Sequence, residues 1–178
     1  MPSPKSFSCE ECGFTLFINA VAAVAAIIQY DDSILATVRA EDPDAGKLDL
    51  PGGFVDHGET AEQALRRELE EELNLKEIMP SYFGTYPNIY PYGSVTYHTL
   101  DLIFTVKLRT MPDITPADDV ASIKWIKKSH LEIQQFAFSS IRAGSRNLPR
   151  LRSINFDCPA AGPDRQQPRA GVGGYGWE

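Results

Sequence analysis

Three glutamates in one short segment, Glu68, Glu71 and Glu72, are the residues whose types and spacing could do chemistry in this chain. Residues 61–73 are rich in strong helix formers, and Thr60 directly before them is a good N-cap. A helix advances by about 100° per residue, so Glu68 and Glu72 fall inside the apolar arc of this helix and Glu71 falls at its edge. Acidic side chains are therefore expected where core-facing leucines point.

Carboxylates in that position need a cationic partner, because an unpaired buried carboxylate is costly and normally becomes neutral. Oxygen ligands without a nearby histidine or cysteine suit Mg²⁺ or Mn²⁺ better than zinc. The alternative is an ordinary charged helix face in contact with water. The glycine-rich residues 49–53 favour the metal, because such a backbone can expose carbonyls and amides to an ion or a phosphate.

A further pair of opposite charges flanks the start of the predicted helix. Glu59 precedes the helix and Arg67 lies on it, eight residues later. An ion pair between them would brace the glycine-rich loop against the helix. Two unrelated surface charges are the alternative.

Together these residues resemble the Nudix box, Gly-x5-Glu-x7-Arg-Glu-U-x-Glu-Glu-x-Gly-U, where U is a bulky aliphatic residue. The matching residues are Gly53, Glu59, Arg67, Glu68, Leu69, Glu71, Glu72 and Leu75. Asn74 replaces the last glycine of the box, and asparagine also tolerates the left-handed conformation that closes a helix. The resemblance extends over residues 19–125 and somewhat beyond, and it implies an α/β/α sandwich with a mixed sheet.

The resemblance also implies roles for the box residues. Glu68, Glu71 and Glu72 would bind Mg²⁺ or Mn²⁺ with the carbonyl of Gly52, and one of these acids or a nearby carboxylate would orient the attacking water. Glu59 and Arg67 would be a structural pair.

The implied activity is metal-dependent hydrolysis of the pyrophosphate bond in a nucleoside diphosphate linked to another moiety, such as NADH or ADP-ribose. The alternative from another class is a non-catalytic Nudix module that senses a ligand or binds a partner. The intact set of box acids argues against that alternative.

Residues 85–93 are predicted to form a substrate loop. This segment holds Asn88, Tyr90 and Tyr92, and aromatic faces beside an amide can hold a nucleobase. Its two prolines align with a proline-rich loop of NADH pyrophosphatases, to which it is similar. A rigid loop that packs on the sheet edge is the alternative. Arg39, at the end of a predicted strand, is a further candidate for substrate binding or else a surface residue.

Three aspartates, Asp101, Asp118 and Asp119, follow that segment. One of them could supply the extra carboxylate that some Nudix relatives use. The sequence does not choose among the three.

Cys9 and Cys12 have the spacing of a zinc knuckle. A structural zinc site needs four ligands, no second Cys-x2-Cys is present, and Cys158 lies far along the chain. The pair resembles the trailing half of the zinc ribbon that precedes some Nudix domains, including NADH pyrophosphatases, and the leading half would then lie upstream of Met1. Residues 1–18 are interpreted as a remnant of that ribbon, so zinc is not expected in this chain alone.

Apolar and turn patterns predict the remaining elements. Strands are expected over residues 20–30, 34–38, 78–86, 94–108 and 120–127, and a short helix from residue 129 or 130 to residue 138 or 142. The Nudix domain is placed at residues 19–144. Residues 145–178 are rich in Pro, Gly and Arg without apolar periodicity and are expected to be a disordered tail.

Composition narrows the range of partners. The chain has 178 residues and a net charge of -7, without a dense run of Lys or Arg, which argues against nucleic acid as a partner. The apolar residues 20–28 are too short to span a membrane, and no signal peptide is recognisable, so a cytoplasmic protein is expected. The partner is expected to be a small nucleotide, and a homodimer is considered because dimers are common among relatives.

Overall fold

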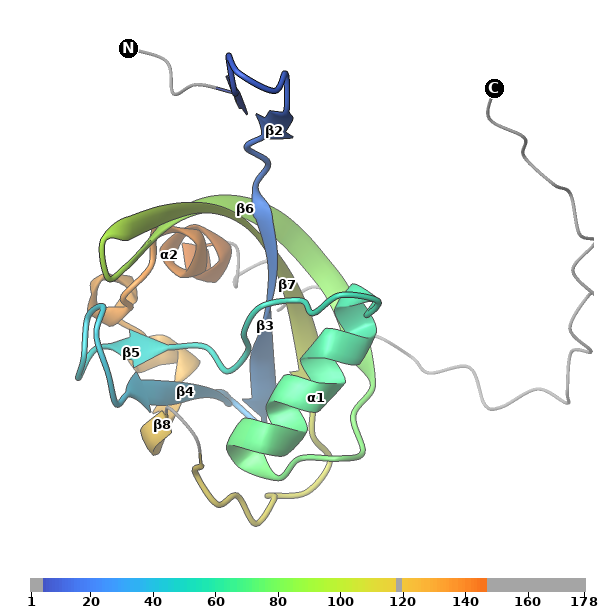
Figure 1. Cartoon of the computed structure of the whole chain (residues 1–178). Coiled ribbons are helices and arrows are strands. Elements are labelled where there is room, and N and C mark those ends of the chain that lie inside the picture. Colours follow the sequence, from blue (N-terminus) through green and yellow to red (C-terminus); the bar gives the residue numbers. More distant parts are fainter. Residues whose placement is uncertain (1–4, 118–119, 147–178) are drawn as a thin grey trace, which may run out of the picture.

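The computed structural model describes residues 5–117 and 120–146 of the chain. Six strands form a curled sheet in the order β5-β4-β3-β7-β6, with β8 paired to β4 (Figure 1). Only β3 and β7 run parallel, so the sheet is mixed. The strands are β3 (Val21–Tyr30), β4 (Ser33–Arg39), β5 (Leu48–Asp49), β6 (Pro80–Tyr92), β7 (Val95–Lys107) and β8 (Val120–Lys127).

Two helices, α1 (Ala61–Leu73) and α2 (Ser139–Arg146), cover opposite faces of the sheet (Figure 1). Strand β3 contributes buried side chains to the core on both faces of the sheet, because successive side chains of a strand point to opposite faces. The buried side chains on the α1 side include Val24, Ala26, Ile28, Ala64, Leu65, Leu69 and Leu73. Those on the α2 side include Ala25, Ile27, Ile103, Phe136, Phe138 and Ile141. The predicted α/β/α sandwich is therefore confirmed.

Helix α1 has the bounds that the sequence predicts. Thr60 and Gln63 form a capping box, in which each side chain bonds to the backbone of the other residue. At the other end Asn74 adopts the left-handed conformation with φ of 53°, and the amide of Leu75 donates to the carbonyl of Leu69. The departure from the box at Asn74 therefore leaves the helix exit unchanged.

The predicted loop over residues 85–93 is wrong, because most of this segment is the second half of β6. Strands β6 and β7 form one long hairpin around a short turn at Gly93. Pro87 and Pro91 suggested a loop, but β6 lies at the edge of the sheet, where a residue without an amide hydrogen costs no ladder bond. The alternation of the strand directs Asn88 and Tyr90 toward the same side.

The predicted helix from residue 129 or 130 is also wrong. The chain forms two 3₁₀ turns, Lys128–His130 and Ile133–Gln135, and the helix α2 begins only at Ser139. Phe136 is buried and pairs with Leu48 in a parallel bridge, and Ala137 donates to the carbonyl of Leu48. That pairing requires an extended backbone, so it interrupts the helix.

Helix α2 continues to Arg146, two residues beyond the predicted end of the domain at residue 144. Gly144 is buried, and a side chain there would press on the end of Ile103. Gly144 therefore belongs to the packed fold. The predicted disordered tail falls almost entirely on residues 147–178, which lie outside the described residues, as does Cys158.

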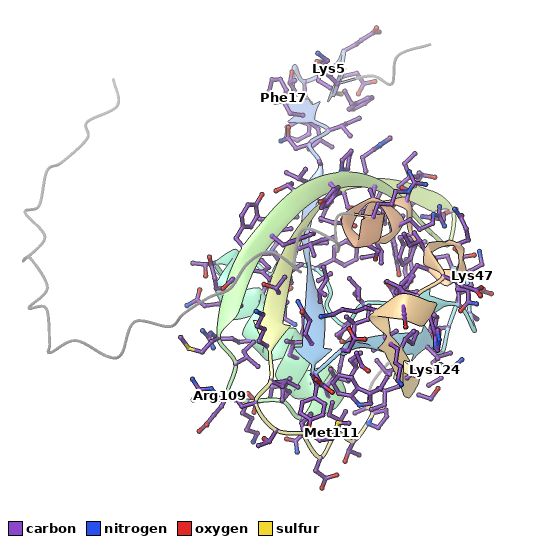
Figure 2. The ribbon with its side chains drawn as sticks, turned by 180° about the vertical axis from the view of Figure 1, so that it is seen from behind. Lys5, Phe17, Lys47, Arg109, Met111 and Lys124 are labelled. Carbon is purple, nitrogen blue, oxygen red and sulfur yellow. The ribbon has the colours of Figure 1, made fainter. Side chains whose placement is uncertain are left out.

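A separate two-stranded hairpin, β1 (Ser6–Ser8) and β2 (Thr15–Phe17), precedes the sandwich. It stands apart from the main sheet in both views of the molecule (Figures 1 and 2), and Cys9 and Cys12 lie in the segment that joins its strands. The interpretation as a zinc-ribbon remnant remains a prediction. Within the part of the chain that the structure describes, we find no helix with the length and apolar character needed to cross a membrane.

The left-handed conformation of Asn74 gives a stability test. Asn74→Ala should lower the free energy of unfolding by about 1 kcal/mol, because a Cβ without a compensating polar group is disfavoured there. Asn74→Gly is the matched control and should be at least as stable as the native chain. Urea denaturation measures both, and an alanine variant as stable as the glycine variant would contradict the analysis.

Candidate active site

Residues 51–55 lie against β3 and carry the glycines of the site. The amides of Val24 and Ala26 donate to the carbonyls of Gly53 and Pro51 at 2.8 and 2.9 Å, and the amide of Val55 donates to Ala22 at 3.1 Å. In an extended chain alternate carbonyls point to opposite sides, so the carbonyl of Gly52 is left outside this pairing.

The close approach requires glycine at two successive positions. Gly52 has a φ of 143°, and a Cβ there would overlap the carbonyl oxygen of Val24. At Gly53 a Cβ would overlap the carboxylate of Glu68. The loop therefore approaches β3 at Gly52 and the Glu68 carboxylate of α1 at Gly53 because neither glycine has a side chain.

The three box glutamates differ in exposure. Glu72 is 5% exposed, and its Oε2 accepts a hydrogen bond from the amide of Gly52 at 2.9 Å. The side chain of Glu68 is 14% exposed and that of Glu71 is 52% exposed. Glu68 and Glu72 are thus directed toward the glycine loop, and Glu71 lies at the rim, as the helical periodicity predicts.

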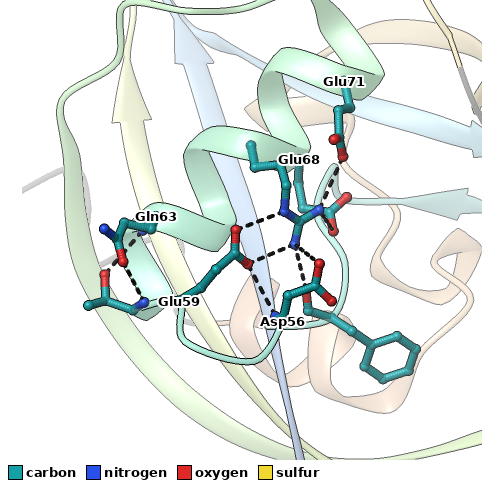
Figure 3. A network of polar contacts seen from close by, with 8 residues as sticks. Asp56, Glu59, Gln63, Glu68 and Glu71 are labelled. Atoms are coloured by element: carbon teal, nitrogen blue, oxygen red, sulfur yellow. Dashed lines mark hydrogen bonds and ion pairs between the residues drawn. The ribbon is translucent and has the colours of Figure 1, made fainter.

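Arg67 connects the acids of α1 to the preceding loop (Figure 3). Its guanidinium donates to both carboxylate oxygens of Glu59 at 2.9 and 3.0 Å, to Glu68 at 2.8 Å and to Glu71 at 3.1 Å. It also donates to the carbonyl of Phe54 at 3.0 Å. The structure therefore contains the predicted Glu59–Arg67 pair, and the same guanidinium extends to two of the candidate metal ligands.

These contacts shift two pKa values. The hydrogen bonds to Glu59, and then those to Glu68 and Glu71, raise the pKa of Arg67 above its ordinary value despite partial desolvation. In return, the hydrogen bond from Arg67 lowers the pKa of Glu59. Both groups therefore remain charged throughout the neutral pH range.

The donor set of this face fits a hard divalent cation. It consists of glutamate oxygens and a backbone carbonyl, without nitrogen or sulfur, as Mg²⁺ and Mn²⁺ prefer. Among the described residues, no group of three or more Asp, Glu, His or Cys side chains is arranged so that it could hold a metal ion. Arg67 draws Glu68 and Glu71 toward its guanidinium, so a cation at this face would have to draw those carboxylates away from it.

A cavity of about 150 Å³ adjoins the glycine loop, between β3, the outer half of β6 and the start of α2. Three of the sequence-predicted substrate residues, Arg39, Asn88 and Tyr90, line it together with Gly52. Tyr92 does not line it: this residue is 62% exposed and stacks on the outer side of Tyr90 at a centroid distance of 6.4 Å. Strand β6 therefore presents Asn88 and Tyr90 to the cavity. Tyr92 lies at the margin of the cavity.

Arg39 is held by a buried carboxylate that the sequence did not single out. Its guanidinium donates to Asp49 at 3.0 Å and to the carbonyl of Pro43 at 2.7 Å, and it lies 4.9 Å from the centre of the Phe138 ring. Burial raises the pKa of Asp49 to about 6, although the Arg39 charge and the Leu50 amide act in the opposite direction. This pair places a cation and a titratable acid at one wall of the cavity.

A second buried carboxylate, Asp101, also lines the cavity. It accepts hydrogen bonds from Thr99 and Ser140, both at 2.5 Å, and Asn88 accepts one from Ser139 at 3.1 Å. These bonds tie β6 and β7 to the N-terminus of α2. The other two candidates for an extra carboxylate, Asp118 and Asp119, lie outside the described residues.

The cavity also contains residues that sequence reasoning missed as binding candidates. Phe54 and Phe138 line it, and Phe54 meets the ring of Tyr90 edge to face at 5.6 Å. Phe54 directly follows Gly52 and the first glycine of the box, Gly53, which is a usable local signal. Phe138 is brought there only by the tertiary packing of α2, for which the sequence carries no comparable signal.

The match to a family model decides the family. The model described as the NUDIX domain matches residues 19–144, which is more than half of the chain. The chain belongs to the Nudix family. The link to the ribbon-bearing subgroup is not established by this match.

Curated Nudix relatives cover only part of the chain. An ADP-ribose pyrophosphatase of Methanocaldococcus jannaschii is 38% identical over 93 residues, which are 51% of this chain and 53% of the relative. An 8-oxo-dGTP diphosphatase of Haemophilus influenzae is 42% identical over 65 residues, 36% of this chain and 48% of the relative. The chain thus spans about half the length of the curated relatives it matches.

A solved structure of another protein shows a similar fold. It is a bifunctional NMN adenylyltransferase/ADP ribose pyrophosphatase from Francisella tularensis, complexed with AMP and a manganese ion. The similarity has a TM-score of 0.58 at 26% identity and covers 75% of this chain and 42% of that one.

The Arg67 network can be tested by substitution with lysine. Arg67→Lys should lower the free energy of unfolding by about 1–3 kcal/mol, because one ammonium group cannot serve Glu59, Glu68 and the Phe54 carbonyl together. Lys76→Ala removes an exposed ion pair with Glu70 and should cost less than about 0.5 kcal/mol. Chemical denaturation compares the two variants, and equal losses would show that the network adds nothing beyond an ordinary surface pair.

The raised pKa of Asp49 gives a pH-dependent test. The folded state holds this proton up to about pH 6 and the unfolded state only to about 3.8, so this group's contribution to stability falls as pH rises through that window. Asp49→Asn should abolish this fall. The difference in unfolding free energy between native and variant chains, measured at several pH values, should change between about pH 4 and 6 and level off above it.

A control separates this effect from simple charge removal. Asp44→Asn alters a more exposed carboxylate, which pairs with Lys47 at 2.7 Å. A pH-independent difference for Asp49→Asn, or the same profile for Asp44→Asn, would contradict the assignment.

Proposed function

We propose that this chain is a metal-dependent hydrolase of the pyrophosphate bond in a nucleoside diphosphate linked to another moiety. The observation that carries the proposal is the hydrogen bond from the Gly52 amide to Glu72. It fixes a buried box carboxylate to the same glycine that lines the cavity. Cation ligands and a substrate cavity therefore share one loop.

Each group has a defined part in this proposal. Glu68, Glu71, Glu72 and the Gly52 carbonyl would hold Mg²⁺ or Mn²⁺, which when bound neutralises the pyrophosphate and lowers the pKa of a water. Arg67 and Glu59 act as positioning residues, because they fix the loop and the orientation of Glu68. One of the acids of α1 would accept the proton of the attacking water.

The cavity would hold the nucleoside part. Tyr90, Phe54 and Phe138 offer aromatic surfaces for a base, and Asn88 offers an amide beside them. Arg39 provides a positive charge for a phosphate or a polar base edge, balanced by Asp49 when no ligand is present. Tyr92 could extend the aromatic surface outside the cavity, since it stacks on Tyr90.

Two substrate classes follow from the relatives. The similarity to an ADP-ribose pyrophosphatase favours a linked diphosphate such as ADP-ribose or NADH, and that to an 8-oxo-dGTP diphosphatase favours a triphosphate. We favour the linked diphosphate, because the first of these matches extends over more of the chain. The products would then be two phosphorylated fragments instead of a monophosphate and pyrophosphate. The cytoplasmic location and the absence of nucleic-acid and membrane partners remain predictions.

The decisive variant is Glu72→Gln, which preserves an acceptor for the Gly52 amide but removes the charge. Activity with Mg²⁺ or Mn²⁺ should fall at least roughly a hundredfold, because an uncharged amide is a poor ligand for a hard cation. Mn²⁺ binding, followed by electron paramagnetic resonance, should weaken in parallel. Glu70→Gln on the exposed side of the same helix is the matched control and should change neither.

The substrate is identified with a panel of ADP-ribose, NADH, sugar nucleotides, dinucleoside polyphosphates and oxidised triphosphates, with chromatography of the products. Near-native turnover by Glu72→Gln would refute the catalytic assignment. A native chain that binds ADP-ribose but cleaves no compound of the panel would favour the alternative of a ligand-sensing module.

A further inference from the structure

Asp101 is a buried carboxylate without a cation beside it. It is 7% exposed and lines the cavity, and no ion pair joins it to any residue that the structure describes. Its two oxygens accept hydrogen bonds from the hydroxyls of Thr99 and Ser140. A carboxylate can accept about four hydrogen bonds, so it has capacity for further donors. Such a group favours a ligand that brings an N–H or O–H to it, and it repels a phosphate.

Asn88 places an unused donor next to this acceptor. Asn88 on β6 and Asp101 on β7 lie diagonally across neighbouring strands, on the same face of the sheet. The carbonyl oxygen of Asn88 accepts a hydrogen bond from Ser139, and its amide nitrogen has no hydrogen-bond partner among the described residues. This nitrogen is not one of the unpaired atoms that are fully enclosed, so it can be reached from the cavity that Asn88 lines.

Helix α2 holds both groups in place. Two consecutive residues at its start, Ser139 and Ser140, donate to Asn88 and to Asp101. The donor and the acceptor are therefore fixed side by side before any ligand binds. Fixed polar groups can discriminate between ligands, because a ligand without the matching group leaves them unpaired.

The surroundings of this pair favour a nucleobase. The aromatic side chains of Phe54, Tyr90 and Phe138 line the same cavity, and planar bases stack on aromatic faces. Ala23 of β3 pairs with Asp101 on one side and bridges Phe54 on the other. Two strand spacings therefore separate Asp101 from the glycine loop, which is about 10 Å. This separation leaves room for a ribose between a base at Asp101 and phosphates at the loop.

We propose that Asp101 and Asn88 read the amino edge of adenine in the substrate. The exocyclic amine donates to Asp101, and a ring nitrogen beside that amine accepts from the amide of Asn88. In an adenine nucleotide the amine carries the only N–H groups of the base, so it is the one group of the base that can satisfy the carboxylate. The inference rests on the proposed function, which favours an adenosine-containing diphosphate such as ADP-ribose or NADH.

The alternative is that Asp101 is structural and only ties β7 to α2 through Ser140. A structural carboxylate would be indifferent to the identity of the base. The two readings are therefore separated by ligands that differ in the amine alone.

The test compares AMP with purine riboside 5′-monophosphate, which has the same ring system without the amine. Binding of each to the native full chain is measured by calorimetry, and this measurement does not depend on cleavage because AMP has no pyrophosphate bond. We expect AMP to bind at least roughly tenfold more tightly, since the analogue leaves Asp101 without its donor.

Two further analogues test Asn88. 1-Deaza-AMP and 7-deaza-AMP each lack one of the two ring nitrogens that lie beside the amine. One of them should bind more weakly than AMP, because it leaves the Asn88 amide without an acceptor. Native affinity for both would refute the part assigned to Asn88.

A pair of variants separates base reading from structural support. Asp101→Asn should reduce the preference for AMP over the amine-free analogue by at least roughly threefold, because a neutral acceptor binds the amine more weakly. Gly144→Ala is the control, since a Cβ there presses on Ile103 and disturbs the packing of α2 on β7 outside the cavity. It should lower the free energy of unfolding and retain the native preference. A native preference in Asp101→Asn would show that the carboxylate is structural only.

The comparison in the native chain decides the inference even if Asp101→Asn does not fold. Equal affinities for AMP and the amine-free analogue, or no binding of AMP, would overturn it. If such a chain still cleaves ADP-ribose, the proposed function stands and the base reading alone fails. A preference for AMP in a chain that cleaves no compound of the panel would support the base reading, and the hydrolase proposal alone would fail.

Discussion

The backbone pairing between residues 51–55 and β3 determines where every candidate group of the active site lies. It holds the loop so close to the strand that only glycine fits at Gly52. The same closeness brings the Gly52 amide to Glu72 and the Gly53 backbone to Glu68. The acidic face of α1 and the cavity are thus joined through a few atoms of main chain, and the site needs no long side chain to connect them.

The parts of this arrangement that the sequence predicted are those whose causes are local. Helix propensity, the cap at Thr60 and the left-handed tolerance of Asn74 all act within α1, so both helix ends were predicted correctly. The spacing of Glu59 and Arg67 likewise gave their ion pair. An apolar run followed by a turn gave β3, and the rough alternation of apolar residues gave β7.

The sequence-based predictions that failed depend on contacts between residues that lie far apart in the chain. Residues 85–93 were expected to be a loop because they contain two prolines. The sequence does not indicate that β6 is an edge strand, where prolines are tolerated. The helix expected from residue 129 or 130 is interrupted because Phe136 pairs with Leu48, nearly ninety residues earlier in the chain. The buried role of Asp49 was missed for the same reason, since its burial and its pairing with Arg39 depend on tertiary packing.

The two prolines of β6 have a consequence for the behaviour of the chain at high concentration. An open strand edge offers free amides and carbonyls to the edge of another molecule, which is a common start of aggregation. Pro87 and Pro91 remove amides from the outer half of β6, where the strand borders the cavity and is held by one neighbour. This half of the edge is thereby made a poor template for intermolecular sheet growth.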